Sequence, residues 1–331
     1  MYDITYHETD LSSSTFLVTG GAGFIGSNIV EYLLKYKAKK VRVLDNLLTG
    51  RYSNLKHFEG NPAFEFIEGD ITDINTCHRA CQGIDYVSHQ AALGSVPRSV
   101  KDPARTNQIN VDGFLNMIIA AKDAAVKTFV YASSSSVYGD ESTLPKVENK
   151  IGKPLSPYAV SKYTNELYAT VFHTNYGLRV IGLRYFNVFG PNQDPDGPYA
   201  AVIPLFVDKI QKKEELFING DGLQTRDFTF VENSVQANIR AMLTKNEAAI
   251  NQVFNIAYGE NYTVNDMYNQ IATLLHSDHK PTYREPRAGD ILNSLANIEK
   301  ARTLLGYDPQ FSFGKGLAIT VKYFTENVTH H

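Results

Sequence analysis

Short apolar runs rich in β-branched residues alternate with longer segments of helical periodicity through the first half of the chain. The runs predict strands at 15–20, 40–45, 64–70, 84–92, 127–134 and 178–190, and the intervening segments predict helices at 24–36, at 111–126 and from about residue 156. Continuous apolar strands that alternate with helices are typical of a parallel sheet covered on both faces. Because the crossovers between such strands are right-handed, the pattern predicts a doubly wound α/β domain.

This regular alternation ends after residue 190. The next stretch, NQDPDGPY, is typical of a loop, and the elements that follow are shorter and less regular. We therefore predict a doubly wound domain over 14–190 and a smaller C-terminal α/β lobe over 191–329, with some of the chain crossing back between them. The 331 residues are 43% apolar, which is enough to bury a substantial core.

Composition and charge exclude several classes of protein. The net charge of −3 argues against a nucleic-acid binder, which usually carries a basic excess. The sequence contains no signal-peptide pattern and no apolar stretch approaching the roughly 18 residues of a membrane span, so we expect no membrane association. Cys77 and Cys81 alone supply neither a disulfide framework nor a metal site. These features predict a cytoplasmic protein with reduced thiols and no bound metal.

A glycine-rich turn joins the first predicted strand to the first predicted helix. Gly20, Gly23 and Gly26 have the spacing at which a pyrophosphate can lie against a helix N-terminus, although such glycines alone also fit a tight turn. Asp45 ends the second strand about twenty residues further on, where a ribose-binding carboxylate is expected. The combination predicts a Rossmann domain that binds a dinucleotide. Asp45 followed by Asn46 favours NAD, since a carboxylate there would repel the 2′-phosphate of NADP.

Two further features lie near the predicted cofactor site. Arg42 and Arg51 would reverse the preference for NAD if they reached the 2′ position, but solvated surface charges fit them better. Asp70 ends the third strand, and either an adenine contact or a helix N-cap explains it. Small residues in HQAAL (89–93) would let a flat cofactor lie close to the end of the fourth strand.

Tyr158 and Lys162 are four residues apart at the start of a predicted helix, so their side chains share one face. A tyrosine with a pKa near ~10 is a poor base at neutral pH, but a nearby ammonium and an oxidised nicotinamide would both favour its phenolate. An isolated YxxxK is usually a solvated helix face, and here the upstream glycine turn supports a catalytic role. Ser133–Ser136 follow the fifth strand and offer hydroxyls to a substrate alcohol, or else form a flexible turn.

The motifs TGGAGFIG, GDITD, HQAA, SSSSVYG, YAVSK and RYFNVFGP occur in this order along the chain. Together they resemble the extended short-chain dehydrogenase/reductase family, specifically its nucleotide-sugar branch, from Phe16 onward. The dehydratases of this branch carry Thr-Asp-Glu where this chain has Ser134, Ser135 and Ser136, and the glutamate of the decarboxylases is also missing. The pattern that remains is similar to the 4-epimerases, with Ser134, Tyr158 and Lys162 at the catalytic positions.

The resemblance implies tightly bound NAD⁺ and a UDP-sugar substrate, with Asn187 near the sugar nucleotide, Phe217 on uracil, and arginines on the diphosphate and ribose. A lobe-bridging salt bridge for the arginines and a core position for Phe217 are the structural alternatives. The expected NAD contacts are Gly20, Gly23, Phe24, Ile25, Gly26, Asp45, Asn46, Gly50, Asp70, Ile71, Gln90, Ala91, Ala92, Asn110, Tyr158, Lys162 and Tyr185. The expected substrate contacts are Gly94, Ser95, Ser134, Ser135, Ser136, Tyr158, Asn187, Ala201, Val202, Phe217, Arg226, Arg287, Asp290 and Ser294.

Ser294, four residues after Asp290, resembles a gate beside the C2 substituent of the sugar. A serine leaves room for an N-acetyl group where a tyrosine admits only a hydroxyl, although a surface serine would look the same. Gly94 and Ser95 also fall at sugar-contact positions of the subgroup that prefers N-acetylated UDP-hexoses. The resemblance therefore implies reversible C4 epimerisation of UDP-N-acetylglucosamine through a 4-keto intermediate, with some activity on UDP-glucose. UDP-glucuronate or N-acetylated uronates remain alternatives, since Arg98 or another cation could meet a carboxylate.

Two other classes of function stay open. A net-redox dehydrogenase or reductase of this fold would exchange NAD(H) with solution, whereas a non-catalytic NAD sensor would usually have lost Tyr158 or Lys162. The family commonly forms homodimers through two helices, here 103–125 and 156–176, and the apolar stripe of Phe114, Met117, Ile118 and Ala121 fits either that interface or the interior of one chain.

Overall fold

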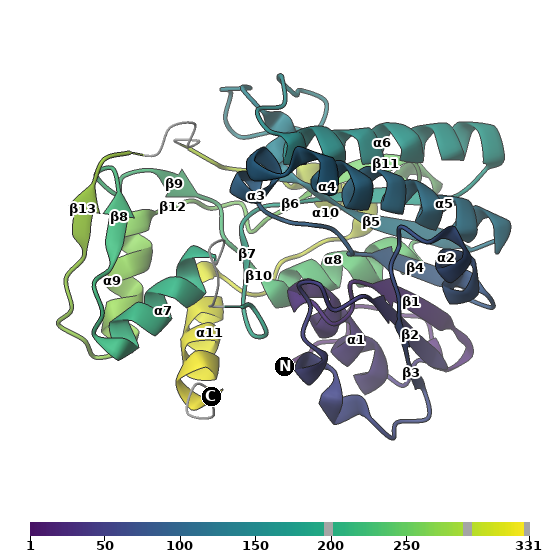
Figure 1. Ribbon diagram of the computed structural model, residues 1–331, viewed down its shortest axis with the longest axis horizontal. Coiled ribbons are helices and arrows are strands. Elements are labelled where there is room, and N and C mark those ends of the chain that lie inside the picture. Colours follow the sequence, from purple (N-terminus) through teal and green to yellow (C-terminus); the bar gives the residue numbers. More distant parts are fainter. Residues whose placement is uncertain (195–200, 287–292, 328–331) are drawn as a thin grey trace.

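Seven parallel strands form the central sheet of the computed structural model, which describes residues 1–194, 201–286 and 293–327 (Figure 1). Their order across the sheet is β3-β2-β1-β4-β5-β6-β11. The strands are β1 (Thr15–Thr19), β2 (Lys40–Asp45), β3 (Phe64–Glu68), β4 (Tyr86–His89), β5 (Thr128–Ser134), β6 (Val180–Tyr185) and β11 (Gln252–Ile256). The strand order reverses between β1 and β4, where doubly wound sheets bind ligands at the carboxyl ends of their strands. The predicted fold class is confirmed.

Helices cover both faces of this sheet (Figure 1). One layer contains α2 (Ile74–Cys81), α3 (Val96–Lys101), α4 (Pro103–Asn107), α5 (Gly113–Asp123) and α6 (Pro157–Tyr176). The other contains α1 (Phe24–Lys35), α8 (Val231–Leu243) and α10 (Glu299–Leu305). Each layer buries its own apolar cluster against the sheet. Because α8, α10 and β11 come from the second half of the chain, the chain returns to the sheet after leaving it. The boundary at residue 190 stays a prediction.

The predicted strand 178–190 is wrong as one continuous element. The structure divides it into β6 and the short β7 (Val188–Phe189), which pairs with β10 (Thr229–Phe230) away from the main sheet. Asn187 lies at the break with a φ of +35°. Asparagine tolerates positive φ better than most residues, so the chain can turn here and leave the sheet. The third and fourth strands are also shorter than predicted. β3 ends at Glu68 and not at residue 70, and β4 ends at His89 and not at residue 92.

The predicted helix 103–125 is interrupted. A π-helical turn at Gln108–Asp112 joins α4 to α5. The apolar stripe that the sequence left open lies inside the chain: all four of its members, Phe114, Met117, Ile118 and Ala121, are fully buried. They belong to the cluster between the sheet and α2, α5 and α6. This stripe is therefore core and gives no evidence for an interface.

A smaller lobe lies beside the carboxyl ends of the strands (Figure 1). It contains α7 (Val202–Lys212), α9 (Val264–Leu274), α11 (Phe313–Asn327) and three two-stranded pairs, and it has its own buried cluster. The strands not yet given are β8 (Phe217–Asn219), β9 (Thr225–Arg226), β12 (Tyr262–Thr263) and β13 (Thr282–Arg284). The 3₁₀ turns of the chain are Leu11–Ser13, Tyr52–Asn54, Lys56–Phe58, Ser135–Tyr138 and Glu247–Ala249.

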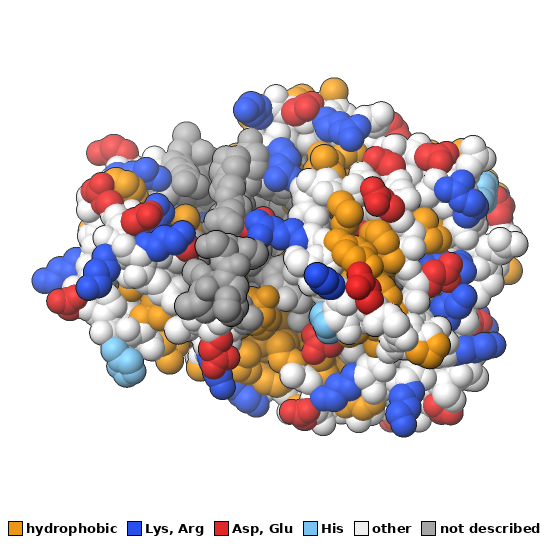
Figure 2. Space-filling view, turned by 60° about the horizontal axis from the view of Figure 1, so that its bottom comes forward, with side chains coloured by type: hydrophobic (Ala, Val, Ile, Leu, Met, Phe, Trp, Pro, Cys, Tyr) orange, Lys and Arg blue, Asp and Glu red, His pale blue; other side chains and the backbone are white. Residues whose placement is uncertain are grey.

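Charged side chains of both signs are interspersed over the face shown in Figure 2. Within the described ranges, no helix has the length and apolar character needed to cross a bilayer, and no group of histidine, cysteine and carboxylate side chains has the arrangement of a metal site. Cys77 and Cys81 are buried, unpaired thiols on α2. Burial raises the pKa of each thiol to about 12, so both resist ionisation and reaction.

Candidate functional site

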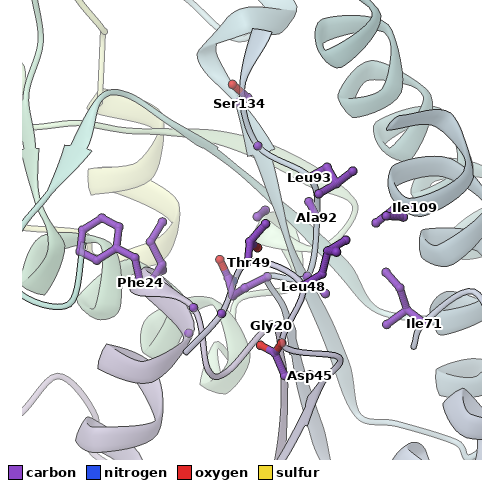
Figure 3. A pocket seen from close by; sticks show the side chains of 18 of the residues that line it. Gly20, Phe24, Asp45, Leu48, Thr49, Ile71, Ala92, Leu93, Ile109 and Ser134 are labelled. Carbon is purple, nitrogen blue, oxygen red and sulfur yellow. The ribbon is translucent and has the colours of Figure 1, made fainter. Parts of the chain in front are cut away.

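A cavity of about 410 Å³ opens at the carboxyl ends of the central strands, where the strand order reverses. The glycine turn between β1 and α1 forms its floor, and residues that follow β2, β4 and β5 form its sides. Figure 3 shows Asp45 and Ser134 toward opposite ends of this cavity, with Leu48, Ile71 and Leu93 between them. The cavity therefore extends from the predicted ribose-binding acid to the predicted catalytic serine.

The glycine turn has the shape of a phosphate cradle. Gly20 has a φ of +66°, and a Cβ atom there would lie 2.7 Å from the Ala91 nitrogen. A Cβ on Gly26 would lie 2.2 Å from the Gly20 carbonyl oxygen. No side chain caps the N-terminus of α1 at Gly23. The first N–H groups of this twelve-residue helix are thus left for an anion, as a dinucleotide pyrophosphate requires.

The Asp45 carboxylate is fixed by the backbone around it. It accepts hydrogen bonds from Ala22 N at 2.9 Å and from Leu47 N at 2.8 Å. Burial raises the pKa of Asp45, while the two N–H donors oppose this rise. Arg42 forms an ion pair with Glu65 at 3.0 Å, and Arg51 forms one with Asp194 at 2.7 Å. Both arginines therefore have carboxylate partners, which agrees with the preference for NAD.

Asp70 does not line the cavity, and it is not a helix cap. Its carboxylate accepts hydrogen bonds from Thr72 N and from the Asn46 side chain, each at 2.8 Å. The residue that caps α2 is Asp73, which accepts from Asn75 N. The N-cap interpretation of Asp70 is therefore wrong. An adenine contact stays a prediction, and what the structure shows is that Asp70 orients Asn46, which does line the cavity.

Tyr158 and Lys162 come from the first two turns of α6 and both line the cavity. The Lys162 Nζ atom donates a hydrogen bond to the Ala132 carbonyl at 2.9 Å, and it lies 6.0 Å from the centre of the Tyr158 ring. Burial lowers the pKa of Lys162 to about 8. Burial also raises the pKa of Tyr158, and a hydrogen bond with Ser134 opposes that rise. In the chain alone, burial dominates the ionisation of both groups.

The four consecutive serines have different surroundings. Ser133 is part of the cavity lining, and its hydroxyl donates a hydrogen bond to the buried Glu166 at 2.5 Å. Ser134 lines the cavity, and its Oγ atom also accepts from Ser136 N to begin the 3₁₀ turn. The Ser136 hydroxyl is shielded from water and has no hydrogen-bond partner within the described ranges. The run thus consists of the end of β5 followed by a hydrogen-bonded 3₁₀ turn, and the flexible-turn interpretation is wrong.

Residues 16–257 match the NAD dependent epimerase/dehydratase family. The chain belongs to this family. It is 37% identical to a putative UDP-glucose 4-epimerase of Methanocaldococcus jannaschii over 94% of this chain and 98% of that protein. Among solved structures, the UDP-N-acetylglucosamine 4-epimerase of Methanobrevibacter ruminantium in complex with UDP-N-acetylmuramic acid is 41% identical, with a TM-score of 0.89 over 95% of this chain and 98% of that one.

A UDP-glucuronic acid 4-epimerase of Bacillus cereus, in complex with UDP-glucuronic acid and NAD, is 32% identical, with a TM-score of 0.87 over 94% of this chain and 99% of that chain. These three relatives carry names with different sugars. Membership of an NAD-dependent enzyme family agrees with the cradle and with Asp45, so NAD is the cofactor that the cavity fits.

Most of the predicted NAD contacts line this one cavity. They are Gly20, Gly23, Phe24, Ile25, Gly26, Asp45, Asn46, Gly50, Ile71, Gln90, Ala91, Ala92, Tyr158, Lys162 and Tyr185. Besides Asp70, only Asn110 of that set is not part of the lining. Asn110 accepts from Leu93 N at 2.7 Å and donates to Leu93 O at 3.1 Å, so it shapes the wall from behind.

The sequence analysis missed apolar and distant contributors to the cavity. Leu48, Thr49, Leu93 and Ile109 line it, but an apolar residue beside a cofactor gives no sequence signal of its own. Their only signal was position, since Leu48 and Thr49 lie between Asp45 and Gly50. Asn238 on α8 was also missed. Its side chain donates to the Tyr185 hydroxyl at 2.7 Å and accepts from Gln90 at 3.1 Å, which holds two lining residues in place.

A second cavity of about 430 Å³ lies in the smaller lobe, where residues of β7, α7 and β8 form much of its lining. Asn187 and Val188 line both cavities, so the two adjoin at this point. Ala201, Val202, Phe217 and Arg226, all predicted substrate contacts, line the second one. Six polar residues of its lining were not predicted: Gln193, Lys209, Glu215, Asn219, Gln224 and Arg284.

Phe217 is 38% exposed, which excludes the core interpretation. The guanidinium group of Arg284 lies 4.9 Å from the centre of its ring and donates to the Asn219 side chain at 2.7 Å. One aromatic face near an arginine is a suitable surface for a planar base.

The remaining predicted substrate contacts are spread more widely. Gly94 lines the first cavity, whereas Ser95, Ser135, Ser136 and Ser294 line neither. Ser95 instead caps α3 by accepting from Arg98 N. Ser294 is partly buried, and its backbone N–H donates to Thr225 O at 3.1 Å, beside Arg226. Arg287 and Asp290 lie outside the described residues.

Proposed function

We propose that the protein catalyses reversible C4 epimerisation of UDP-N-acetylglucosamine and UDP-N-acetylgalactosamine. The support is the junction of the two cavities at Asn187 and Val188. A nucleotide sugar whose base and diphosphate occupy the second cavity would extend its sugar toward Ser134 and Tyr158 in the first. The three relatives named above carry the names of UDP-sugar 4-epimerases, which supports the same reaction.

The glycine turn and Asp45 would hold NAD⁺, which when bound supplies a reversible hydride acceptor for C4 of the sugar, so that the reaction needs no external oxidant. The Tyr158 oxygen would take the proton of the 4-hydroxyl group, and Ser134 would hold that hydroxyl by a hydrogen bond. Lys162, fixed by its bond to Ala132 O, would bind the nicotinamide ribose and place positive charge near the phenol. Contacts to the uridine diphosphate far from C4 would retain the 4-keto intermediate while the sugar turns over.

The preference for an N-acetylated sugar rests on Ser294 as a small residue beside C2. The hydrogen bond from Ser294 N to Thr225 O, next to Arg226, supports a position of Ser294 near the substrate phosphates. UDP-glucuronate is the second candidate, because Arg98 on α3, four residues after the lining residue Gly94, and the B. cereus relative both favour it. A net-redox dehydrogenase is the third, and NADH accumulating during turnover would identify it.

Proton NMR of the purified protein with UDP-N-acetylglucosamine and no added cofactor tests the proposal. Anomeric signals of UDP-N-acetylgalactosamine would support epimerisation, retained NAD⁺ and a permissive site together. If no product forms, the same sample receives NAD⁺, then UDP-glucose and UDP-glucuronate. Conversion of only one of these would replace the proposed substrate, and conversion of none would contradict 4-epimerisation.

A homodimer and a cytoplasmic location belong to this proposal. Val160, Leu167 and Val171 on α6 are each about half exposed, at 52%, 51% and 48%, and form an apolar stripe on the outer face of the helix. We expect this stripe, in place of the buried stripe of α5, to meet a second copy. Light scattering should give twice the mass of one chain, and Leu167→Glu should give a monomer. The buried free thiols of Cys77 and Cys81 fit a reducing compartment.

A further inference from the structure

Asp227 lies where three distant parts of the chain meet. It follows β9 and precedes β10, its side chain is fully buried, and one of its oxygens, Oδ1, accepts from Tyr258 N at 3.2 Å and Gly259 N at 3.3 Å. The other oxygen, Oδ2, accepts from Ala296 N at 3.1 Å. One carboxylate thus binds the β11–β12 connection and the segment that contains Ala296.

The backbone of Asp227 binds a third segment. Its carbonyl oxygen accepts from the Asn187 side chain at 3.1 Å, and Asn187 lines both cavities. On the other side, Ser294 N donates to Thr225 O, two residues before Asp227. Arg226, which lines the second cavity, is the immediate neighbour. The segments of Asn187, Arg226 and Ser294, which come from distant parts of the chain, are therefore all bonded at or next to Asp227.

We propose that Asp227 is a positioning residue. Its carboxylate holds the segment of Ser294 through Ala296 and the β11–β12 connection through Tyr258 and Gly259. Together with its carbonyl bond to Asn187, this keeps Asn187, Arg226 and Ser294 in the arrangement that binds the nucleotide sugar. The inference rests on the proposed function and adds to it a residue that lines neither cavity. Burying a carboxylate destabilises the fold unless its hydrogen bonds offset the free energy of removing the charge from water. Three N–H donors converging on one side chain explain why an acceptor on both oxygens is needed here.

Asp227→Asn removes some of the hydrogen bonds that the carboxylate accepts, while the side chain keeps nearly the same size and shape. An amide retains one acceptor oxygen, but its NH₂ group would face a backbone N–H donor where the second oxygen stood. At least one of the two attachments, to Ala296 or to Tyr258 and Gly259, is then lost. We expect KM for the UDP-sugar to rise roughly tenfold while kcat stays nearly unchanged. A tenfold weaker binding is about what the loss of one buried hydrogen bond produces.

Asp85→Asn is the matched control. Asp85 also accepts from a backbone N–H, that of Thr15 at 2.9 Å, but it lies just before β4, at the amino ends of the strands, and lines neither cavity. This variant should retain the wild-type KM. The NAD content of both variants should equal that of the wild type, because Asp227 lies outside the lining of the first cavity. A KM for Asp227→Asn within twofold of wild type would overturn the proposal, as would an equal rise in Asp85→Asn.

The hydrogen-exchange rates of the Ala296, Tyr258 and Gly259 amides show whether their hydrogen bonds to Asp227 are formed, and they can be measured without substrate. In Asp227→Asn at least one of these amides should exchange faster while the amides of β6 are unchanged, whereas a mere loss of stability would accelerate exchange throughout. Unchanged exchange at all three would overturn the proposal.

Calorimetric titration with UDP separates this proposal from the proposed function. If the wild type binds UDP but converts no UDP-sugar, epimerisation fails, and weaker UDP binding by Asp227→Asn still supports positioning. Equal affinity, or a wild type that binds no UDP, overturns positioning.

Discussion

Lys162 Nζ lies 6.0 Å from the centre of the Tyr158 ring and is held there by its hydrogen bond to the Ala132 carbonyl. The two side chains share one face of α6, and both line the cavity that ends at Ser134. Burial shifts their pKa values in opposite directions, that of Tyr158 upward and that of Lys162 down to about 8. A cationic nicotinamide in the cavity would favour the phenolate that the chain alone disfavours.

Tyr158→Phe removes the proposed base while the ring stays in place. We expect kcat to fall by roughly 10³-fold, within the range that one general acid–base group contributes. NAD released by denaturing the protein should match the wild type, since the Lys162 contact is unaffected. Turnover near the wild-type rate with NAD still bound would exclude Tyr158 as the base.

Asp45→Asn should weaken discrimination between the two dinucleotides. The carboxylate is fixed by Ala22 N and Leu47 N beside the glycine cradle, where its charge would repel a 2′-phosphate. We expect NADH affinity to fall roughly tenfold and NADPH affinity to rise relative to it, measured by fluorescence titration of protein stripped of cofactor. Arg42→Gln is the control, because Arg42 is paired with Glu65 and should leave both affinities unchanged. An unaltered ratio in Asp45→Asn would place the ribose elsewhere.

Ser294→Tyr tests the proposed gate. If Ser294 lies beside C2 of the sugar, the larger side chain should reduce kcat/KM for UDP-N-acetylglucosamine by roughly 10²-fold, a typical steric discrimination, and change that for UDP-glucose by much less. Ser294→Ala controls for loss of the hydroxyl and should leave both values near wild type. Equal losses on the two substrates would show that the residue does not distinguish them.

Glu166→Gln should strongly destabilise the fold. Glu166 lies one turn after Lys162 and pairs with Arg184 at 2.7 Å, with both side chains buried, and it also accepts from Ser133. Removing one partner leaves a buried charge unpaired, which costs about 3–5 kcal/mol of unfolding free energy. Glu247→Gln breaks the exposed pair with Arg179 and should cost less than about 1 kcal/mol. Urea unfolding of both variants gives the comparison, and similar losses would contradict this account.

The unfolding free energy should depend on pH through the titration of Asp227. Burial raises its pKa to about 7 in the folded protein, against about 4 in an unfolded chain. Above about pH 7 the carboxylate that accepts the three N–H bonds is ionised. Between about pH 4 and pH 7 the folded protein holds a proton that the unfolded chain has released, so this contribution to stability is fully present below pH 4. It is lost as the pH rises to about 7.

At ~1.4 kcal/mol per pKa unit the contribution amounts to about 4 kcal/mol. Urea unfolding of wild type and Asp227→Asn at pH 5 and pH 8 measures it, because all other titrating groups are common to both proteins. The wild type should lose more stability over this interval than the variant. Parallel pH profiles would show that Asp227 titrates as in the unfolded chain.

The sequence by itself determined the features that depend on near neighbours. Strand and helix periodicity gave the doubly wound sheet, because a buried parallel strand and the helix that covers it each have a characteristic local pattern. The glycine turn needed only the conformations of three residues, and Tyr158 and Lys162 needed only one helical turn to share a face. Asp45 could be recognised because its distance from the glycines is fixed within one βαβ unit.

Only the tertiary structure decided how distant residues combine. It showed that Ser134, and not Ser135 or Ser136, lines the first cavity, because a strand end and a 3₁₀ turn point consecutive side chains in different directions. It also showed that Asn187 breaks a strand and lies between two cavities, and that Asp227 binds the backbone at Ala296. Such contacts depend on where the chain returns after leaving the sheet. A local hydrophobic pattern contains no record of that path.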